Sequence, residues 1–238
     1  MKRSILLISA MLSLCLGAGA LTIYEIQYTS SRGVDNSFPS PYLGKVVSVE
    51  GVVTAAGYRN SGFFLSENVS GAWRGIFVQT NSYTPSVGSY VRLTGEVAET
   101  YGMTCLQDIR NYRVLDRNRP LPKPVIISTG QLENPHEAEA YEGVYARLIN
   151  SSVSSAKSAS GKFMVTDGSG QCRITLGAFG AKPAQSPAAG TQYAQIAGIV
   201  TFGYGEYNLN PFSASDLQIQ QPVSTQNRSW GKIKSIYK

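Results

Sequence analysis

Few residues of this chain are of the types that carry out hydrolytic or metal-assisted chemistry. The sequence has a single histidine, His136, so enzymes that need two imidazoles, as catalytic groups or as zinc ligands, are excluded. The neighbouring carboxylates Glu137, Glu139 and Glu142 lack metal-ligand spacing and fall on a connector and its exit. We therefore expect no catalytic residues, no metal and no cofactor, and hence no enzyme.

The first residues have the pattern of an export signal. Two basic residues precede an almost wholly apolar run at 5–16, and residues 18–20 have the small-x-small pattern that signal peptidase accepts. We expect a signal peptide, residues 1–20, cleaved after Ala20, and a secreted or periplasmic mature chain. An uncleaved membrane helix is one alternative, but the run is too short to span ~30 Å of hydrocarbon. A lipoprotein anchored at Cys15 is another, disfavoured by the bulky residue before it.

Cleavage leaves two cysteines, Cys105 and Cys172, in different halves of the chain. In an oxidising compartment they could form one disulfide that joins the halves. Two buried free thiols are the other outcome, and the commoner one for cysteines in such surroundings.

The mature chain has the pattern of short β-strands punctuated by glycine, with no long helical period. At 47–53 and 90–97, apolar residues and glycine alternate with polar ones, which indicates strands with one buried face. A glycine in the middle of a strand relieves crowding where the strand bends round a small barrel. We therefore expect an all-β fold of five-stranded closed barrels, with a two-sheet sandwich as the alternative.

Short motifs recur in the same order, 99 to 103 residues apart. The matched pairs are 62–65 with 161–164, Gly88 with Gly190, Gly95 with Gly198, and the Tyr-Gly dipeptides at 101–102 and 204–205. This repeat predicts homologous β-modules at 21–115 and 141–219. Between them, residues 116–140 contain four prolines and are expected to form a semi-rigid connector, and residues 220–238 form a basic tail.

The first module resembles the oligonucleotide/oligosaccharide-binding (OB-fold) module that precedes the catalytic domain of secreted bacterial extracellular nucleases. The segments that carry this resemblance are 23–27, 41–54, 62–65, 75–78, 87–97 and 99–104, with a more diverged copy from 141–144 to 210–212 and 216–217. The resemblance implies two tandem OB-fold-like barrels. The metal-dependent nuclease domain of that family would have to follow them, and we expect the accessory modules without it.

In OB-folds, the outer face of strands 2 and 3 stacks aromatic rings on bases and contacts phosphates through Arg and Lys. By alternation, Phe64 and Phe77 lie on the opposite face of their strands from their branched neighbours. The candidate nucleic-acid-binding residues are Tyr58, Arg59, Phe64, Trp73, Arg74, Phe77 and Tyr101 in the first module, and Lys162, Met164, Arg173 and Tyr204 in the second. The alternative is that Phe64 and Phe77 pack against the connector or the other barrel.

Charge argues against strong binding to a polyanion. The formal charge of +6 falls to +4 on cleavage, and the tail alone carries +4, whereas the first module is neutral, the connector −1 and the second module +1. Because nucleic-acid affinity normally depends on several phosphate contacts, neutral barrels predict weak and strongly salt-sensitive binding at best.

The tail has its own pattern. Trp230, Ile233 and Tyr237 fall at i, i+3 and i+7, with Lys232 and Lys234 alongside. A short amphipathic helix that docks on a partner or an anionic surface is one interpretation, and a frayed chain end is the other.

These patterns together predict a secreted, non-catalytic protein whose tandem OB-fold modules weakly bind single-stranded or extracellular DNA. Its expected partner is a separate nuclease or an envelope protein, and no transmembrane segment is expected in the mature chain. The alternatives are a structural or protein-interaction role at the cell envelope and the binding of a saccharide.

Overall fold

The computed structural model describes residues 20–34, 37–180 and 187–221. The predicted signal peptide up to residue 19 and the tail from residue 222, with Trp230, Lys232, Ile233, Lys234 and Tyr237, lie outside the described residues. None of the helices in the described ranges is long and apolar enough to cross a membrane.

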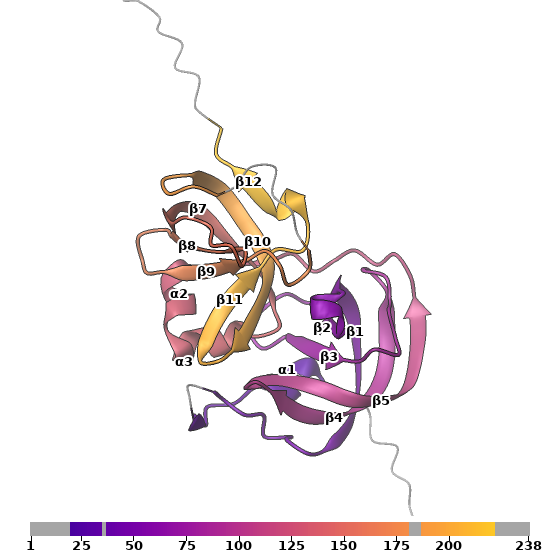
Figure 1. The fold of residues 1–238 in the computed structure, drawn as a ribbon. Helices are drawn as coiled ribbons and strands as arrows, with labels where there is room; N and C mark the ends of the chain where they lie inside the picture. Colours follow the sequence, from indigo (N-terminus) through magenta and orange to yellow (C-terminus); the bar gives the residue numbers. More distant parts are fainter. Residues whose placement is uncertain (1–19, 35–36, 181–186, 222–238) are drawn as a thin grey trace, which may run out of the picture.

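The first half of the chain forms a closed barrel of five strands in the order β1-β2-β3-β5-β4 (Figure 1). The elements are β1 (Val46–Ala56), the 3-10 turn η2 (Tyr58–Asn60), β2 (Gly62–Ser66), β3 (Gly75–Gln79), β4 (Tyr90–Thr100) and β5 (Met103–Asp116). Only β3 and β5 pair in parallel within this barrel; its other neighbours are antiparallel. The strands expected at 47–53 and 90–97 are confirmed as parts of β1 and β4.

A short helix, α1 (Ile23–Gln27), packs on this barrel. Thr22 caps it, because its side chain accepts the backbone N–H of Glu25 while the Glu25 carboxylate accepts the N–H of Thr22. Ile23 and Ile26 point into the barrel core and are fully buried. The helix therefore contributes to the core of the first half.

The second half forms a seven-stranded sheet in the order β12-β10-β11-β9-β8-β7-β6, in which β10 also pairs with β7. Its elements are β7 (Tyr145–Ser155), β8 (Lys162–Thr166), β9 (Cys172–Thr175), β10 (Gln192–Gly203), β11 (Glu206–Asn210), the 3-10 turn η4 (Ala214–Asp216) and β12 (Leu217–Ile219). The prediction of a β fold is confirmed in its coarser form, since the described residues form mostly strands with a few short helices and one closed five-stranded barrel. The second sheet differs from a plain five-stranded one because β6 and β12 extend it.

The connector is more ordered than its prolines suggest. It contains β6 (Val125–Ile126), which is an edge strand of the second sheet, and then α2 (Thr129–Glu133), α3 (Pro135–Ala138) and the 3-10 turn η3 (Glu139–Tyr141). Figure 1 shows α2 and α3 beside that sheet. Ser128 caps α2 and Asn134 caps α3. Leu132 and Ala138 are buried in the same hydrophobic core as the apolar side chains of the second sheet, so the connector packs on the second half.

The repeated motifs have the same backbone conformation in both halves. Gly88 and Gly190 have φ of 84° and 83°, and Tyr101 and Tyr204 have φ of 54° and 56°. Because a positive φ is uncommon for tyrosine, its recurrence at matched positions supports the sequence repeat.

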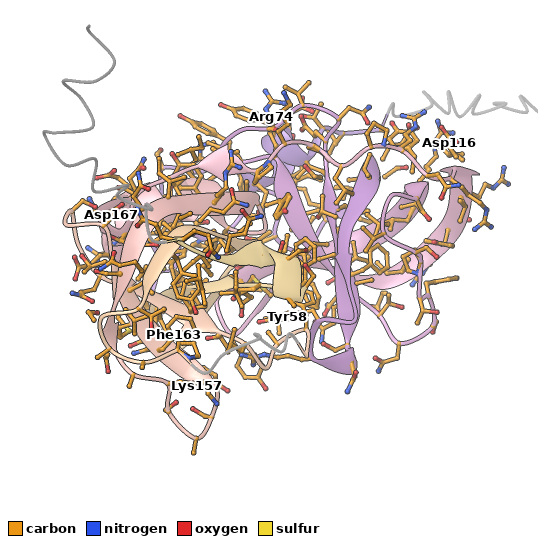
Figure 2. All side chains as sticks on the ribbon, turned by 90° about the horizontal axis from the view of Figure 1, so that it is seen from above. Tyr58, Arg74, Asp116, Lys157, Phe163 and Asp167 are labelled. Carbon is orange, nitrogen blue, oxygen red and sulfur yellow. The ribbon has the colours of Figure 1, made fainter. Side chains whose placement is uncertain are left out.

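The two halves share one hydrophobic core. This larger cluster includes Tyr58, Phe64 and Phe77 from the first half together with buried residues of the second sheet, and Phe179 packs against it. The Tyr58 ring lies 5.3 Å from each of the Phe64, Phe77 and Phe179 rings, measured between centroids. Figure 2 shows Tyr58 near the boundary between the halves. A separate core fills the first barrel.

Backbone segments also meet closely between the halves. A Cβ on Gly75 would collide with the carbonyl of Gly143, and a Cβ on Gly143 would come within 2.7 Å of the Gly75 carbonyl carbon and oxygen. Gly143 has φ of 72° and donates its N–H to Val200 of β10. Only residues without a Cβ permit this approach of β3 to the segment that follows the connector.

Gly75→Ala is therefore expected to destabilise the protein by about 1–3 kcal/mol, because the inserted methyl group forces backbone apart. Urea unfolding followed by circular dichroism measures the change. Gly177→Ala is the control, since nothing lies within 4 Å of its Cβ position. Equal midpoints for the two variants would contradict this account of Gly75.

Cys105 and Cys172 are both free and buried. Of the two alternatives, a disulfide or two buried free thiols, the structure therefore contains the free thiols. Burial raises the pKa of the Cys105 thiol to about 11 and that of Cys172 to about 12. Thiolate, the reactive form, is therefore scarce at neutral pH.

Ellman's reagent is expected to react with neither thiol at pH 8 in native protein lacking residues 1–20. Unfolding in guanidinium without a reductant should expose both, and absorbance at the reagent's product band counts them. Finding no reactive thiol after unfolding would mean that the two cysteines are bridged.

Candidate binding cleft

A cavity of about 460 Å³ lies between the two halves. Its walls come from η2 and β3, the β4–β5 hairpin, the β10–β11 hairpin, and the ends of β8 and β9. That volume falls within the range of small-ligand pockets in proteins. Both halves contribute side chains, so the cavity exists only because the halves pack together.

Two exposed tyrosines stand at the tips of the facing hairpins. Tyr101 and Gly102 form the turn between β4 and β5, and Tyr204 and Gly205 form the turn between β10 and β11. All four residues have positive φ, as two-residue hairpins of type I′ require. The tyrosine side chains are 66% and 79% exposed, and their ring centroids lie 5.1 Å apart. The repeat thus brings its two copies into contact at the cleft.

Two basic side chains at the cavity have no carboxylate partner in the described part of the chain. Arg59 and Lys162 line the cavity and are exposed, and neither takes part in the ion pairs found there. The Arg59 backbone N–H donates to the carbonyl of Ala178, and its guanidinium lies 5.3 Å from the Tyr58 ring centroid. Glu206 also lines the cavity, but it pairs with Arg173. The cleft therefore has a local excess of positive charge.

The remaining wall contains apolar side chains, including Met103 and Phe202, and polar groups that hydrogen-bond to one another. The Thr100 hydroxyl donates to the Gln79 amide oxygen at 2.8 Å, and the Asn210 amide donates to the Thr201 hydroxyl at 2.8 Å. These bonds hold hydroxyl and amide groups in place without a ligand. Sequence reasoning missed these residues, since isolated Thr, Gln and Asn on strands give no motif.

The structure brings six of the predicted site residues to this cavity and leaves the others elsewhere. Those that line it are Tyr58, Arg59, Phe77, Tyr101, Lys162 and Tyr204. Of the rest, Arg173 is in the ion pair with Glu206, and four others do not line the cavity: Phe64, Trp73, Arg74 and Met164.

An exposed stacking face on β2 and β3 is a wrong prediction. The alternation itself is right, because Phe63 and Leu65 point into the barrel core and Phe64 points the other way. However, the second half covers that outer face, so Phe64 is 0% and Phe77 2% exposed. The alternative, in which both rings pack against the rest of the protein, is the one the structure has.

Trp73 and Arg74 belong to a separate aromatic group near α1. The Trp73 ring packs edge-on against Tyr28, with centroids 5.5 Å apart. Arg74 pairs with Glu67 and lies over the Tyr24 ring, so its charge is already matched. These two residues therefore do not extend the cleft.

The described residues contain no group of three or more His, Cys, Asp or Glu side chains arranged to hold a metal ion. The cleft contains aromatic rings, two cations, the paired carboxylate of Glu206 and neutral hydrogen-bonding groups. These groups suit the binding of a ligand.

Comparison with known proteins does not identify a family. No protein family and no curated protein matches the chain. One solved structure, described as "Structural mimicry for functional antagonism", matches over 75% of this chain and 93% of its own, with 12% sequence identity and a TM-score of 0.28. A likeness at that TM-score carries no argument about fold or function.

Phe64→Ala is expected to lower the free energy of unfolding by about 3–5 kcal/mol, because it empties a fully buried ring site. Tyr204→Ala, at an exposed hairpin tip, should cost less than about 1 kcal/mol. Urea titration of both variants measures the difference. An unchanged free energy of unfolding for Phe64→Ala would contradict the burial of this ring and would favour an exposed binding face at Phe64.

Proposed function

We propose that this is an exported, non-catalytic binding protein built of two tandem OB-fold-like units. The second sheet supports this because β7, β8, β9, β11 and β10 pair in the same order as β1, β2, β3, β5 and β4. The parallel pair falls at the matching place, β9 with β11 and β3 with β5. On this proposal β6 and β12 are additions to a second five-stranded unit.

The ligand we propose is single-stranded nucleic acid, bound in the cleft between the halves. The observation that carries this proposal is a pair of exposed tyrosines, Tyr101 and Tyr204, in one cavity with two cations. Those cations, Arg59 and Lys162, have no carboxylate partner among the described residues. Aromatic rings stack on bases of any sequence, at about 1–3 kcal/mol per base, while Arg and Lys contact the phosphates. Extracellular DNA is the form that an exported protein would meet.

The charge of the cleft predicts weak binding. Two phosphate contacts on a single strand give a slope of about −1.4 in log affinity against log salt, at about 0.7 per contact. Raising salt fourfold should then weaken binding about sevenfold. Such a protein could hold DNA loosely for a separate nuclease or an envelope partner.

The test is fluorescence anisotropy with a labelled 12-nucleotide oligo-dT at ~50 mM and ~200 mM salt. Tyr101→Ala with Tyr204→Ala should weaken binding at least tenfold, because two stacking surfaces are lost. Arg59→Gln with Lys162→Gln should weaken it and flatten the salt dependence.

Matched controls separate the cleft from the rest of the surface. Tyr28→Ala removes an exposed tyrosine that does not line the cavity, and Lys157→Gln removes an exposed lysine outside it. Both should leave affinity unchanged. Absence of binding by the parent protein at low salt, or equal losses in the controls, would contradict the proposal.

Saccharide binding is the second candidate, favoured by the hydroxyl and amide groups of the cavity wall, including Thr201 and Asn208. It predicts salt-independent binding of neutral oligosaccharides that still requires Tyr101 and Tyr204. A purely structural or protein-contact role predicts that neither ligand binds.

A further inference from the structure

Three carboxyl groups interact with one another where the two halves meet; we refer to Glu99, Glu139 and Glu142 as the carboxyl cluster. Glu139 and Glu142 are buried and Glu99 is half-buried. Glu99 lies on β4, Glu139 in η3, and Glu142 just after it. Glu139 and Glu142 are 4% and 2% exposed. The Tyr207 hydroxyl on β11 donates to Glu139 Oε2 at 2.6 Å, and the Thr104 backbone N–H on β5 donates to Glu142 Oε1 at 2.8 Å. The cluster therefore joins the first barrel, the connector and the second sheet.

The hydrogen bonds of the cluster are incomplete. Thr104 also donates its hydroxyl to Glu99 Oε1 at 2.7 Å, so Glu99 and Glu142 both bind this one residue. Glu99 Oε2 and Glu142 Oε2 are buried without a hydrogen-bond partner among the described residues. A buried carboxylate oxygen without a donor is costly when ionised.

No cation offsets these charges in the described part of the chain. The titratable groups that act on the cluster are its own three carboxyls, the Tyr207 hydroxyl and the Cys105 thiol. None of its members takes part in an ion pair found there, and His136 and Glu137 on the adjoining α3 are exposed. Ionisation thus adds negative charge to a site where no described cation acts on Glu139 or Glu142.

Burial and mutual repulsion accordingly favour the protonated carboxyls. Burial raises the pKa of Glu139 to about 7, against the opposing effect of the Tyr207 hydrogen bond and with a further rise from Glu99. Burial, with repulsion from Glu139 and Glu99, raises the pKa of Glu142 well above its usual value.

The cluster is connected to both hairpins of the cleft. Thr100 and Met103, which line the cavity, flank the β4–β5 turn between Glu99 and Thr104. On the other side, Tyr207 lies between two cavity residues of β11, Glu206 and Asn208. A change in how the cluster packs would therefore move the elements that carry Tyr101 and Tyr204.

We propose that the carboxyl cluster is a pH-dependent switch at the interface of the two halves, holding the cleft closed when protonated and loosening it when ionised. For the ligand, this inference rests on the proposed function, because loosening separates the two tyrosines and lowers affinity for an anionic strand. The predicted loosening of the interface itself does not depend on the identity of any ligand.

The direction of the pH effect follows from linkage. The pKa of Glu139 in the folded protein lies above its ordinary value of 4.5. The contribution of the protonated carboxyl to interface stability is therefore fully present below pH 4.5. That contribution is lost as the pH rises through about 7.

Hydrogen exchange between about pH 6 and pH 8.5 tests the interface. The reporters are backbone amides that bond across it, Trp73 N–H to the Ala140 carbonyl and Arg59 N–H to the Ala178 carbonyl. Their protection factors, corrected for intrinsic exchange, should fall about tenfold, a typical size for coupling within a protein. Amides pairing β1 with β4 inside the first barrel should keep theirs.

Glu139→Gln and Glu142→Gln, singly and together, imitate the protonated side chain and should abolish the pH dependence of the interface amides. Glu137→Gln, at an exposed position on the connector, is the matched control and should retain it. Protection factors that do not change with pH, or that fall equally throughout the protein, would overturn the switch.

Oligo-dT anisotropy over the same pH range completes the test. Affinity should fall about tenfold from pH 6 to 8.5 in the parent protein and stay constant in Glu139→Gln/Glu142→Gln. Loss of interface protection without oligo-dT binding at any pH would support the switch and contradict the nucleic-acid proposal. Oligo-dT binding together with amide protection factors that do not change with pH would support the nucleic-acid proposal and contradict the switch.

Discussion

One aromatic cluster, buried between the two halves, holds them together and so positions the elements that form the cleft. Phe64 and Phe77 lie on the outer face of β2 and β3, and Tyr58 of η2 packs beside them. Phe179 meets these rings from the second half. Large rings dominate the free energy of such contacts. The close approach of Gly75 and Gly143 permits the segment after the connector to lie against the barrel at the same interface. Once the halves are joined in this way, their hairpins must face each other.

That packing creates the cleft and also buries the carboxyl groups of Glu139 and Glu142 at the interface. Tyr101 and Tyr204 meet because equivalent hairpins are brought together, although each tyrosine is local to its own turn. The same packing removes Glu139 and Glu142 from water. Buried carboxyls without a cation cost stability, unlike the apolar contacts around them. An interface that contains both kinds of contact is stable yet sensitive to the state of a few protons.

Much of the fold could be predicted from residue patterns. The alternation at 47–53 and 90–97 predicted parts of β1 and β4, and the repeated Tyr-Gly dipeptides marked two hairpin tips with matching backbone. Such patterns are local, because strand periodicity and positive φ depend on near neighbours. The order within the connector was less visible, since α2 and α3 are only 5 and 4 residues long.

Residue patterns alone predict the strands at 47–53 and 90–97, the opposite facing of neighbouring side chains, and the repeat that matches Tyr101 with Tyr204. Which faces of the strands meet solvent depends on how the two halves pack. Alternation placed Phe64 opposite Phe63 correctly, but whether the outer face binds a ligand or another part of the chain depends on contacts far apart in sequence. The same holds for Glu139 and Glu142, which look like solvated connector residues until β5 and β11 cover them. Burial is a property of the whole packing, and no local pattern encodes it.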